Sequence, residues 1–462
     1  MSASTTAPTA GKDEVKPGLL RQIAESNGLM GLLAIVSALI VGSVLILVAD
    51  PDVRTTAGYF LARPSDFLGA CVTSLGDAYS ALVRGGLFDW QAHSTARMWR
   101  PLTETLVNAT PLIFAGLGMS VAFRAGLFNV GGQGQIIVGA IVGGYAGFAW
   151  DLPAGVHLVV AIACAVLGGA LWGAIPGVLK AATGASEVIT TIMLNSIGAY
   201  LIAHMLTLKT FIGEGNSNPR SLPVGANATF PQLMGPSFRL HAGFLLALAT
   251  AWLVWWLLER STLGFQFRAT GLNPEAARTA GINVPRVTAL VMIVSGALCG
   301  LAATGPVLGT QKYLTASIAG SIGFDAMTVA LLGRSKPLGT VLAGILFGGL
   351  TAGGTLMQAA TGTSIDIVLI LQSTIVLFIA APPLVRAIYR LPAPGSFKRS
   401  QDGKRRTPVS GAPESAESAT EPAATESTES TETAVSATEP AATEPTESTE
   451  TAVPATEPGQ EA

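Results

Sequence analysis

The chain has 462 residues, of which 49% are hydrophobic and only 12% are charged, with a formal net charge of −2. That charged share is about half of what a soluble globular protein carries, so the composition excludes an ordinary soluble enzyme or nucleic-acid-binding protein. The three cysteines lie far apart and form no CxxC motif, so a disulfide framework or cysteine metal site is not expected.

The first 28 residues are polar, and we expect a disordered cytoplasmic N-terminus there. The first apolar run begins near Leu29 and is too long for the core of a signal peptide, so we interpret it as a retained transmembrane helix. Apolar stretches of about 20 residues, the length that crosses a bilayer as a helix, then recur along the chain. Hydropathy predicts spans at 29–49, 103–123, 133–150, 157–179, 188–207, 241–258, 287–310, 318–333, 337–358 and 366–386.

The fold class predicted from this pattern is an all-α polytopic membrane protein, with a transmembrane domain over 29–391. Ten transmembrane helices is the best count, with eight or nine as alternatives. The segment 318–333 is short and interrupted by Gly320, Gly323 and Asp325, which indicates a half-span or re-entrant element.

Basic residues predict the orientation of the chain. With the N-terminus in the cytoplasm, the arginines of the 259–286 loop and those after the last span lie inside, as the positive-inside rule requires. Segment 50–102 opposes the rule because it would be outside with five arginines. We therefore expect a multi-pass protein of a bacterial cytoplasmic membrane, with both termini in the cytoplasm.

The C-terminal tail, 392–462, has a different composition. An 18-residue unit at 419–436 recurs almost unchanged at 437–454. Twelve glutamates follow Arg406, which leaves 17 acidic against 27 basic residues in the rest of the chain, a net charge of about +10. Pro/Thr/Glu/Ala repeats cannot bury enough apolar surface to fold, so we expect a disordered acidic tail.

One polar stretch between apolar runs, "FRATGLNPEAARTAGINV" at 267–284, carries strong local signals for a short helix. Asn273 is suited to the N-cap and Pro274 to the first helical position. Glu275 and Arg278 complement the two ends of the helix dipole, and Gly281 supplies a left-handed stop. These signals predict a capped helix of about seven residues, roughly 10 Å long. Capping alone does not distinguish a simple connector from a docking element.

The stretch "LGFQFRATGLNPEAARTAGINV" resembles the cytoplasmic loop of permease subunits of ABC importers, in the branch that serves nucleosides and simple sugars. Further segments are similar to the same family in the same order: 109–140 ("ATPLIFAGLGMSVAFRAGLFNVGGQGQIIVGA"), 184–201 ("GASEVITTIMLNSIGAYL") and 323–354 ("GFDAMTVALLGRSKPLGTVLAGILFGGLTAGG"). The resemblance covers roughly residues 100–390. The chain departs from the family at Gly132, where an acidic residue is common, which puts any carboxylate role at that place in doubt.

The resemblance implies that the short helix is a coupling helix, which sits in a groove of the ATPase subunit. The residues that match or flank this pattern are Gly264, Arg268, Ala269, Gly271, Asn273, Pro274, Glu275, Ala276, Ala277, Arg278, Ala280 and Gly281. It also implies partners: an ABC ATPase subunit that binds ATP and Mg, a second related permease subunit as a heterodimer, an extracytoplasmic solute-binding protein and a nucleoside or sugar substrate. The chain itself has no P-loop, and we expect it to bind no cofactor or metal and to catalyse no reaction.

Polar side chains within predicted spans are candidates for a solute pathway, since such groups are costly in lipid and face the bundle interior or a cavity. The candidates are Asn108, Asn129, Gln133, Gln135, Asn195, Asp325, Gln358 and Gln372. The alternative interpretation for each amide is a hydrogen bond between helices. We expect an ABC permease for nucleosides, with ribose or another simple sugar as the second substrate class. A secondary transporter remains an alternative, although embedded charges are sparse, and no reactive constellation indicates a membrane enzyme.

Overall fold

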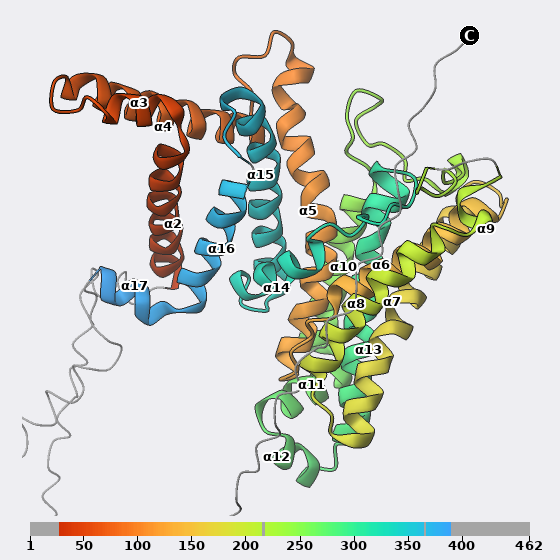
Figure 1. The fold of residues 1–462 in the computed structure, drawn as a ribbon. Coiled ribbons are helices and arrows are strands. Elements are labelled where there is room, and N and C mark those ends of the chain that lie inside the picture. Colours follow the sequence, from red (N-terminus) through yellow and green to blue (C-terminus); the bar gives the residue numbers. More distant parts are fainter. Residues whose placement is uncertain (1–26, 215–217, 365, 390–462) are drawn as a thin grey trace, which may run out of the picture. The chain divides into compact units, whose positions relative to one another are not determined.

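The structure, a computed structural model, describes residues 27–214, 218–364 and 366–389 (Figure 1). Nearly all of the predicted N-terminal segment and the whole predicted tail with its repeat lie outside these residues. The described part is helical and contains no strand, apart from two isolated bridges. The helices are α2 (Asn27–Ala49), α3 (Pro51–Ala57), α4 (Pro64–Gly86), α5 (Thr95–Arg124), α6 (Gly132–Ala149), α7 (Val156–Thr183), α8 (Glu187–Met205), α9 (Lys209–Ile212), the 3-10 turn η1 (Ala226–Ala228), α10 (Gly243–Arg260), α11 (Thr262–Leu272), α12 (Pro274–Thr279), α13 (Val284–Thr304), the π-helical turn η2 (Gly305–Thr310), α14 (Ile322–Leu332), α15 (Pro337–Thr361), α16 (Asp366–Ala380) and α17 (Pro382–Ile388).

The described chain is an all-helical polytopic membrane protein, and each predicted span overlaps at least one helix. The predicted span 287–310 is divided between α13 and η2, and the predicted span 366–386 between α16 and α17. The predicted count of ten crossings is not confirmed. Six described helices are long and apolar enough to cross a membrane, or seven if α2 and α3, bent by 73° at their junction, form one span. The apolar parts of α14 and α16 are shorter than the roughly 20 residues that a crossing needs.

Two helices, α3 and α4, occupy the segment that the sequence analysis left as an external connection. They run across the end of α2 rather than along it (Figure 1). The Tyr79 hydroxyl of α4 donates to the Leu39 carbonyl of α2 at 2.7 Å, while Leu68 and Val72 remain exposed. Because only one side of α4 is apolar, hydropathy alone did not reveal it.

Glycines line the seam between α7 and α13, where the two helix backbones approach each other closely. A Cβ built on Gly169 would lie 2.6 Å from Gly300 Cα, and one on Gly139 of α6 would lie 2.7 Å from the same atom. Such close approach of helix backbones is typical of membrane bundles, in which small residues permit tight van der Waals packing.

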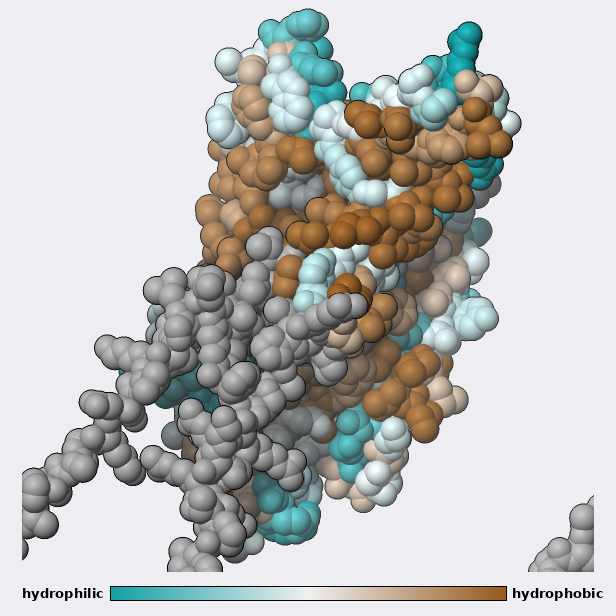
Figure 2. All heavy atoms as spheres, turned by 90° about the vertical axis from the view of Figure 1, so that its left-hand side faces the viewer, coloured by the Kyte–Doolittle hydropathy of each residue, from teal (hydrophilic) through white to brown (hydrophobic). Residues whose placement is uncertain are grey.

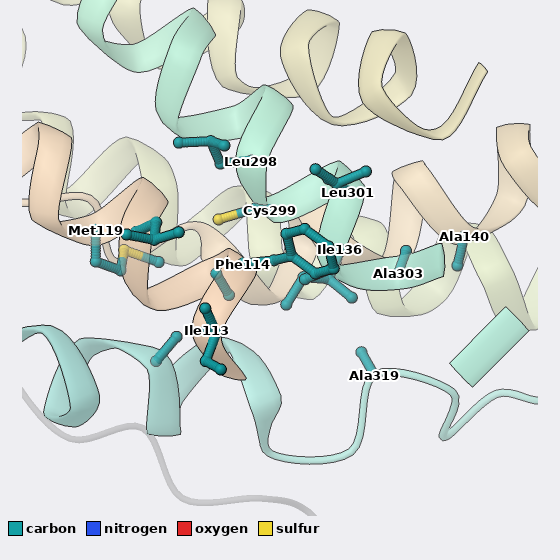
Figure 3. Close-up of a cluster of buried hydrophobic side chains, with 14 of the residues drawn as sticks. Ile113, Phe114, Met119, Ile136, Ala140, Leu298, Cys299, Leu301, Ala303 and Ala319 are labelled. Carbon is teal, nitrogen blue, oxygen red and sulfur yellow. The ribbon is translucent and has the colours of Figure 1, made fainter. Parts of the chain in front are cut away.

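The hydrophobic core lies where α5, α6 and α13 meet. Phe114 and Met119 of α5, Ile136 of α6 and Cys299 of α13 are fully buried there and point toward one another (Figure 3). One face of the molecule shows a broad hydrophobic band with hydrophilic residues above and below it (Figure 2). This banding fits a protein surrounded by a bilayer.

Candidate functional site

A cavity of about 310 Å³ lies between α5, η2, α14, α15 and α16; we call it the α5–α14 cavity. Its volume is at the lower end of the range of small-molecule sites, roughly 300–1,000 Å³. Three of the eight predicted pathway residues line it, namely Asn108, Asp325 and Gln372. Further polar lining residues are Arg239, Thr310, Gln311, Ser317, Ser321 and Thr351.

Asp325 enters the cavity from the first turn of α14. The preceding segment, 311–321, is not helical, so the predicted interruption is confirmed at Gly320. It is wrong at Gly323 and Asp325, because both lie within the continuous helix α14. The Ser321 hydroxyl donates to Asp325 Oδ2 at 2.6 Å, which holds the carboxylate at the N-terminal end of α14. Irregular backbone at membrane depth is tolerated where it lines a cavity rather than lipid.

Asn108 and Gln372 enter from the other walls. Asn108 precedes Pro111, which lies inside α5 and has no N–H to offer the carbonyl of Val107. The side chain of Gln372 on α16 is buried and donates to Thr351 Oγ1 on α15 at 3.3 Å. The cavity thus combines a carboxylate, which accepts hydrogen bonds, with amides and hydroxyls, which both donate and accept them.

The turn η2 forms another wall with Gly305, Pro306 and Thr310. It is a π-helical turn that continues α13, and such turns occur frequently at functional sites.

Gln133 lies at the cavity's edge rather than in its lining. Its side chain donates to the Gly320 carbonyl at 2.6 Å and accepts from the Gly323 N–H at 3.0 Å. It therefore anchors the non-helical segment before α14 to α6, and its placement favours the structural interpretation.

Asn129, Gln135 and Asn195 form a separate buried amide cluster. Asn129 and Gln135 exchange two hydrogen bonds, at 3.0 and 3.2 Å, and Asn129 also donates to Ser295 Oγ at 2.8 Å. Asn195 accepts from the Gly134 N–H and donates to the Val130 carbonyl. All three side chains bond within the protein and none lines the α5–α14 cavity, which again favours the structural interpretation.

Gln358, the remaining candidate, is exposed near the C-terminal end of α15 and is not a lining residue of this cavity. Two lining residues were not predicted from the sequence: Arg239, which reaches the cavity from the segment before α10, and Gln311, which follows η2. Arg239 lies just before the predicted span 241–258, and no local sequence signal showed that this part of the chain folds back onto the bundle. Gly132, the departure from the family pattern, is buried, and a Cβ there would meet Met119 Cε, the end of a flexible side chain.

The predicted coupling loop contains two helices, α11 and α12, at the end of the bundle opposite α3 and α4 (Figure 1). The prediction of a short capped helix is confirmed by α12. The Asn273 side chain accepts from the N–H groups of Glu275 and Ala276 at 3.0 and 3.1 Å, and Pro274 is the first helical residue. Gly281 has a φ of +84°, as the left-handed stop requires. The preceding α11 was not predicted.

Within this loop, the residues divide into exposed and packed groups. The exposed set comprises Asn273, Pro274, Glu275, Ala276, Arg278, Ala280 and Gly281. Gly264 and Ala277 are buried, and Arg268, Ala269 and Gly271 are partly buried. Ala277 is 3% exposed, so it packs against this chain rather than being available to a partner.

A larger cavity, about 590 Å³, lies along the polar side of α4 and is lined by Asp50, Asp77 and Arg84 among others. It lies largely outside the part of the chain that matches a known family, as described next.

Residues 102–380 match the protein family described as branched-chain amino acid transport system / permease component. The guanosine ABC transporter permease protein NupP of Bacillus subtilis is 37% identical to this chain, over 62% of the chain and 82% of the relative. The nucleoside ABC transporter permease protein NupB of Lactococcus lactis is 34% identical, over 66% and 86%. The glucose ABC transporter permease protein TsgB13 of Haloferax volcanii is 35% identical, over 60% and 75%. No solved structure matches the chain.

Proposed function

Because the chain belongs to the family of branched-chain amino acid transport system permease components, we propose that it is the membrane-spanning subunit of an ABC importer for nucleosides. The observation that carries this proposal is the α5–α14 cavity, which brings Asn108, Asp325 and Gln372 together in the permease region. Amide, carboxylate and hydroxyl groups suit the sugar hydroxyls and base edges of a neutral nucleoside.

The proposed mechanism is alternating access. A separate binding protein delivers the solute to the external face, and ATP-driven closure of separate ATPase subunits shifts the cavity from outward to inward access. ATP and Mg belong to those ATPase subunits in this proposal. A second, related permease subunit completes the transporter; relatives named NupP and NupQ, and NupB and NupC, support such a pair.

The coupling element is α12. Its exposed residues, among them Glu275, Ala276 and Arg278, offer a short rigid surface that would fit a groove of the ATPase. Arg278 donates to both carboxylate oxygens of Glu275, at 2.9 and 3.0 Å, so the ion pair lies within α12 and stabilises that helix. Caps at both ends give this surface a fixed shape without help from a partner.

Uptake of labelled guanosine by cells that express the assembled transporter tests the substrate class. We expect unlabelled nucleosides to compete and ribose and glucose not to compete. Competition by ribose or glucose, without competition by nucleosides, would support the sugar interpretation that the glucose permease relative favours. Uptake that persists after the ATPase genes are deleted would instead indicate a secondary transporter.

The coupling role is tested by Ala276→Arg, because Ala276 is exposed on α12. We expect the larger, charged side chain to block docking, so that the ATPase no longer copurifies and uptake is lost. Ala57→Arg is the matched control, since Ala57 is an exposed alanine at the end of α3, on the opposite side of the bundle. Copurification and uptake that survive Ala276→Arg would contradict the coupling role.

A further inference from the structure

Three charged side chains connect α11 to the end of α5. Glu259, near the C-terminal end of α10, accepts from Arg268 of α11 through Oε2 at 2.6 Å. Its other oxygen, Oε1, accepts from Arg124, the last residue of α5, at 3.1 Å. One carboxylate therefore holds the coupling loop and the last turn of α5 at the same time.

Arg124 also reaches the end of α14. Its Nε donates to the Ser335 carbonyl at 3.0 Å while another nitrogen of the same guanidinium holds Glu259. Ser335 in turn donates its N–H to the Ala330 carbonyl of α14 at 2.8 Å. A planar guanidinium with several fixed donors can hold two acceptors in one geometry, which a lysine ammonium does less well.

The backbones of the same elements are in direct contact. A Cβ on Gly271, near the C-terminal end of α11, would lie 2.7 Å from the Ala125 carbonyl carbon and closer still to the Arg124 carbonyl oxygen. Gly126, with a φ of +73°, faces Gly271 from the other side. The backbones of α11 and the end of α5 therefore touch directly, as transmission of a displacement of α11 would require.

The segment that receives Arg124 has a strained backbone. Arg334 and Ser335 have φ values of +54° and +52°, in the left-handed region that residues other than glycine rarely adopt. Strain of this kind is concentrated at switch regions, where surrounding contacts hold it in place.

We propose that Glu259, Arg124 and Arg268 form a charged relay that passes movement of the coupling loop to α5 and α14, the helices that carry Asn108 and Asp325 into the α5–α14 cavity. This inference rests on the proposed function. The three side chains are positioning residues, since none of them lines the cavity. The relay joins two walls of the cavity to one coupling element, so both walls move together when the ATPase moves α11 and α12.

The test uses the complete transporter with Glu259→Gln, which keeps the size of the side chain and removes its charge. We expect guanosine uptake per assembled complex to fall about tenfold, within the range of known coupling effects, while the ATPase still copurifies and still hydrolyses ATP. Partly exposed ion pairs contribute little to stability, so the variant should fold. Asp66→Asn is the matched control, because Asp66 forms an exposed ion pair with Arg63 at 3.9 Å on α4, remote from α11.

A second variant, Arg124→Lys, keeps the charge but cannot hold Glu259 and Ser335 together as the guanidinium does. We expect it to uncouple hydrolysis from uptake in the same way. If both variants lower only the amount of complex and leave uptake per complex unchanged, the three residues only stabilise the fold, and the proposal that they transmit movement is wrong. If the unmodified transporter neither binds an ATPase nor takes up guanosine, the proposed function itself fails.

Discussion

The α7–α13 seam and the α5–α14 cavity lie in the same bundle but differ in how much space separates neighbouring elements. Along the seam, Gly169, Gly296 and Gly300 bring two backbones together so closely that a methyl group does not fit. Around the cavity, the backbone departs from the α-helix at η2 and again between η2 and α14. A membrane helix gives up its regular hydrogen bonds only where other groups replace them. The difference indicates a closely packed, rigid seam on one side and, on the other, a cavity whose walls depart from regular helix.

The largest effect is expected from filling the seam. Gly169→Val places branched carbons against the backbone of α13, and we expect a loss of about 3 kcal/mol or more of stability because the close-packed backbones cannot move apart. Folded yield and the thermal transition in detergent measure this. Gly76→Ala is the control, since a Cβ there meets nothing within 4 Å, and it should leave the transition unchanged or raise it slightly. A Gly169→Val protein as stable as the parent would show that the seam is not rigid.

The amide cluster around Asn129 allows a contribution to stability to be distinguished from a contribution to transport. Asn129→Ala removes bonds to Gln135 and Ser295 and leaves buried polar groups without partners, so we expect a loss of about 2 kcal/mol. Thermal unfolding checks the loss, and uptake per folded molecule should stay the same. Gln358→Ala, which truncates an exposed amide, should change neither quantity. A specific loss of uptake in Asn129→Ala would return Asn129 to the solute pathway.

These sites also show what the sequence could predict. The caps of α12 were predicted correctly, because Asn273, Pro274 and Gly281 act on backbone groups within a few residues of themselves. The helical spans were predicted for the same reason, since each depends on the apolar character of one continuous stretch.

The composition of the cavity could not be predicted in full. Whether an amide in a span faces a cavity or another helix depends on contacts far away in sequence, such as Gln133 with Gly320 and Asn129 with Ser295. Arg239 looked like an ordinary loop residue and lines the cavity, because the chain before α10 folds back onto η2. Of eight polar candidates with similar local surroundings, the fold brought only Asn108, Asp325 and Gln372 into the lining.

Asp325→Asn tests the cavity with a smaller expected effect. The amide keeps the shape of the carboxylate but loses its charge and part of its capacity to accept, so guanosine uptake should fall about tenfold with little change in stability. Asp366→Asn is a close control, because Asp366 is also in the first turn of its helix and also accepts from a serine hydroxyl, that of Ser364, at 2.9 Å. It is exposed and is not a lining residue of the α5–α14 cavity. Equal uptake by both variants would remove Asp325 from the pathway.

The smallest effect concerns His241, which lies where the loop before α10 meets η2. The ring is buried, stacks on Phe230 at 5.3 Å between centroids, and its Nδ1 accepts from the Gly243 N–H at 3.2 Å. Burial, with the nearby charge of Arg239, lowers the pKa of His241 to about 4. Above about pH 7.5 the ring is almost entirely neutral in both the folded and the unfolded chain, so it makes almost no pH-dependent difference there.

As the pH falls from 6.5 toward 4, the unfolded chain binds a proton at His241 that the folded chain does not, so stability falls with pH in this window. Between pH 7 and 5.5 the loss from this group should be about 1 kcal/mol. His241→Gln keeps an acceptor for Gly243 and removes the titration, so the drop in thermal transition from pH 7 to 5.5 should be smaller in the variant than in the parent. Other groups titrate equally in both proteins, so the difference between the two falls in transition temperature gives the contribution of the His241 ring. Identical drops would mean that water or another acceptor reaches His241, so that the loop before α10 is not packed tightly against η2.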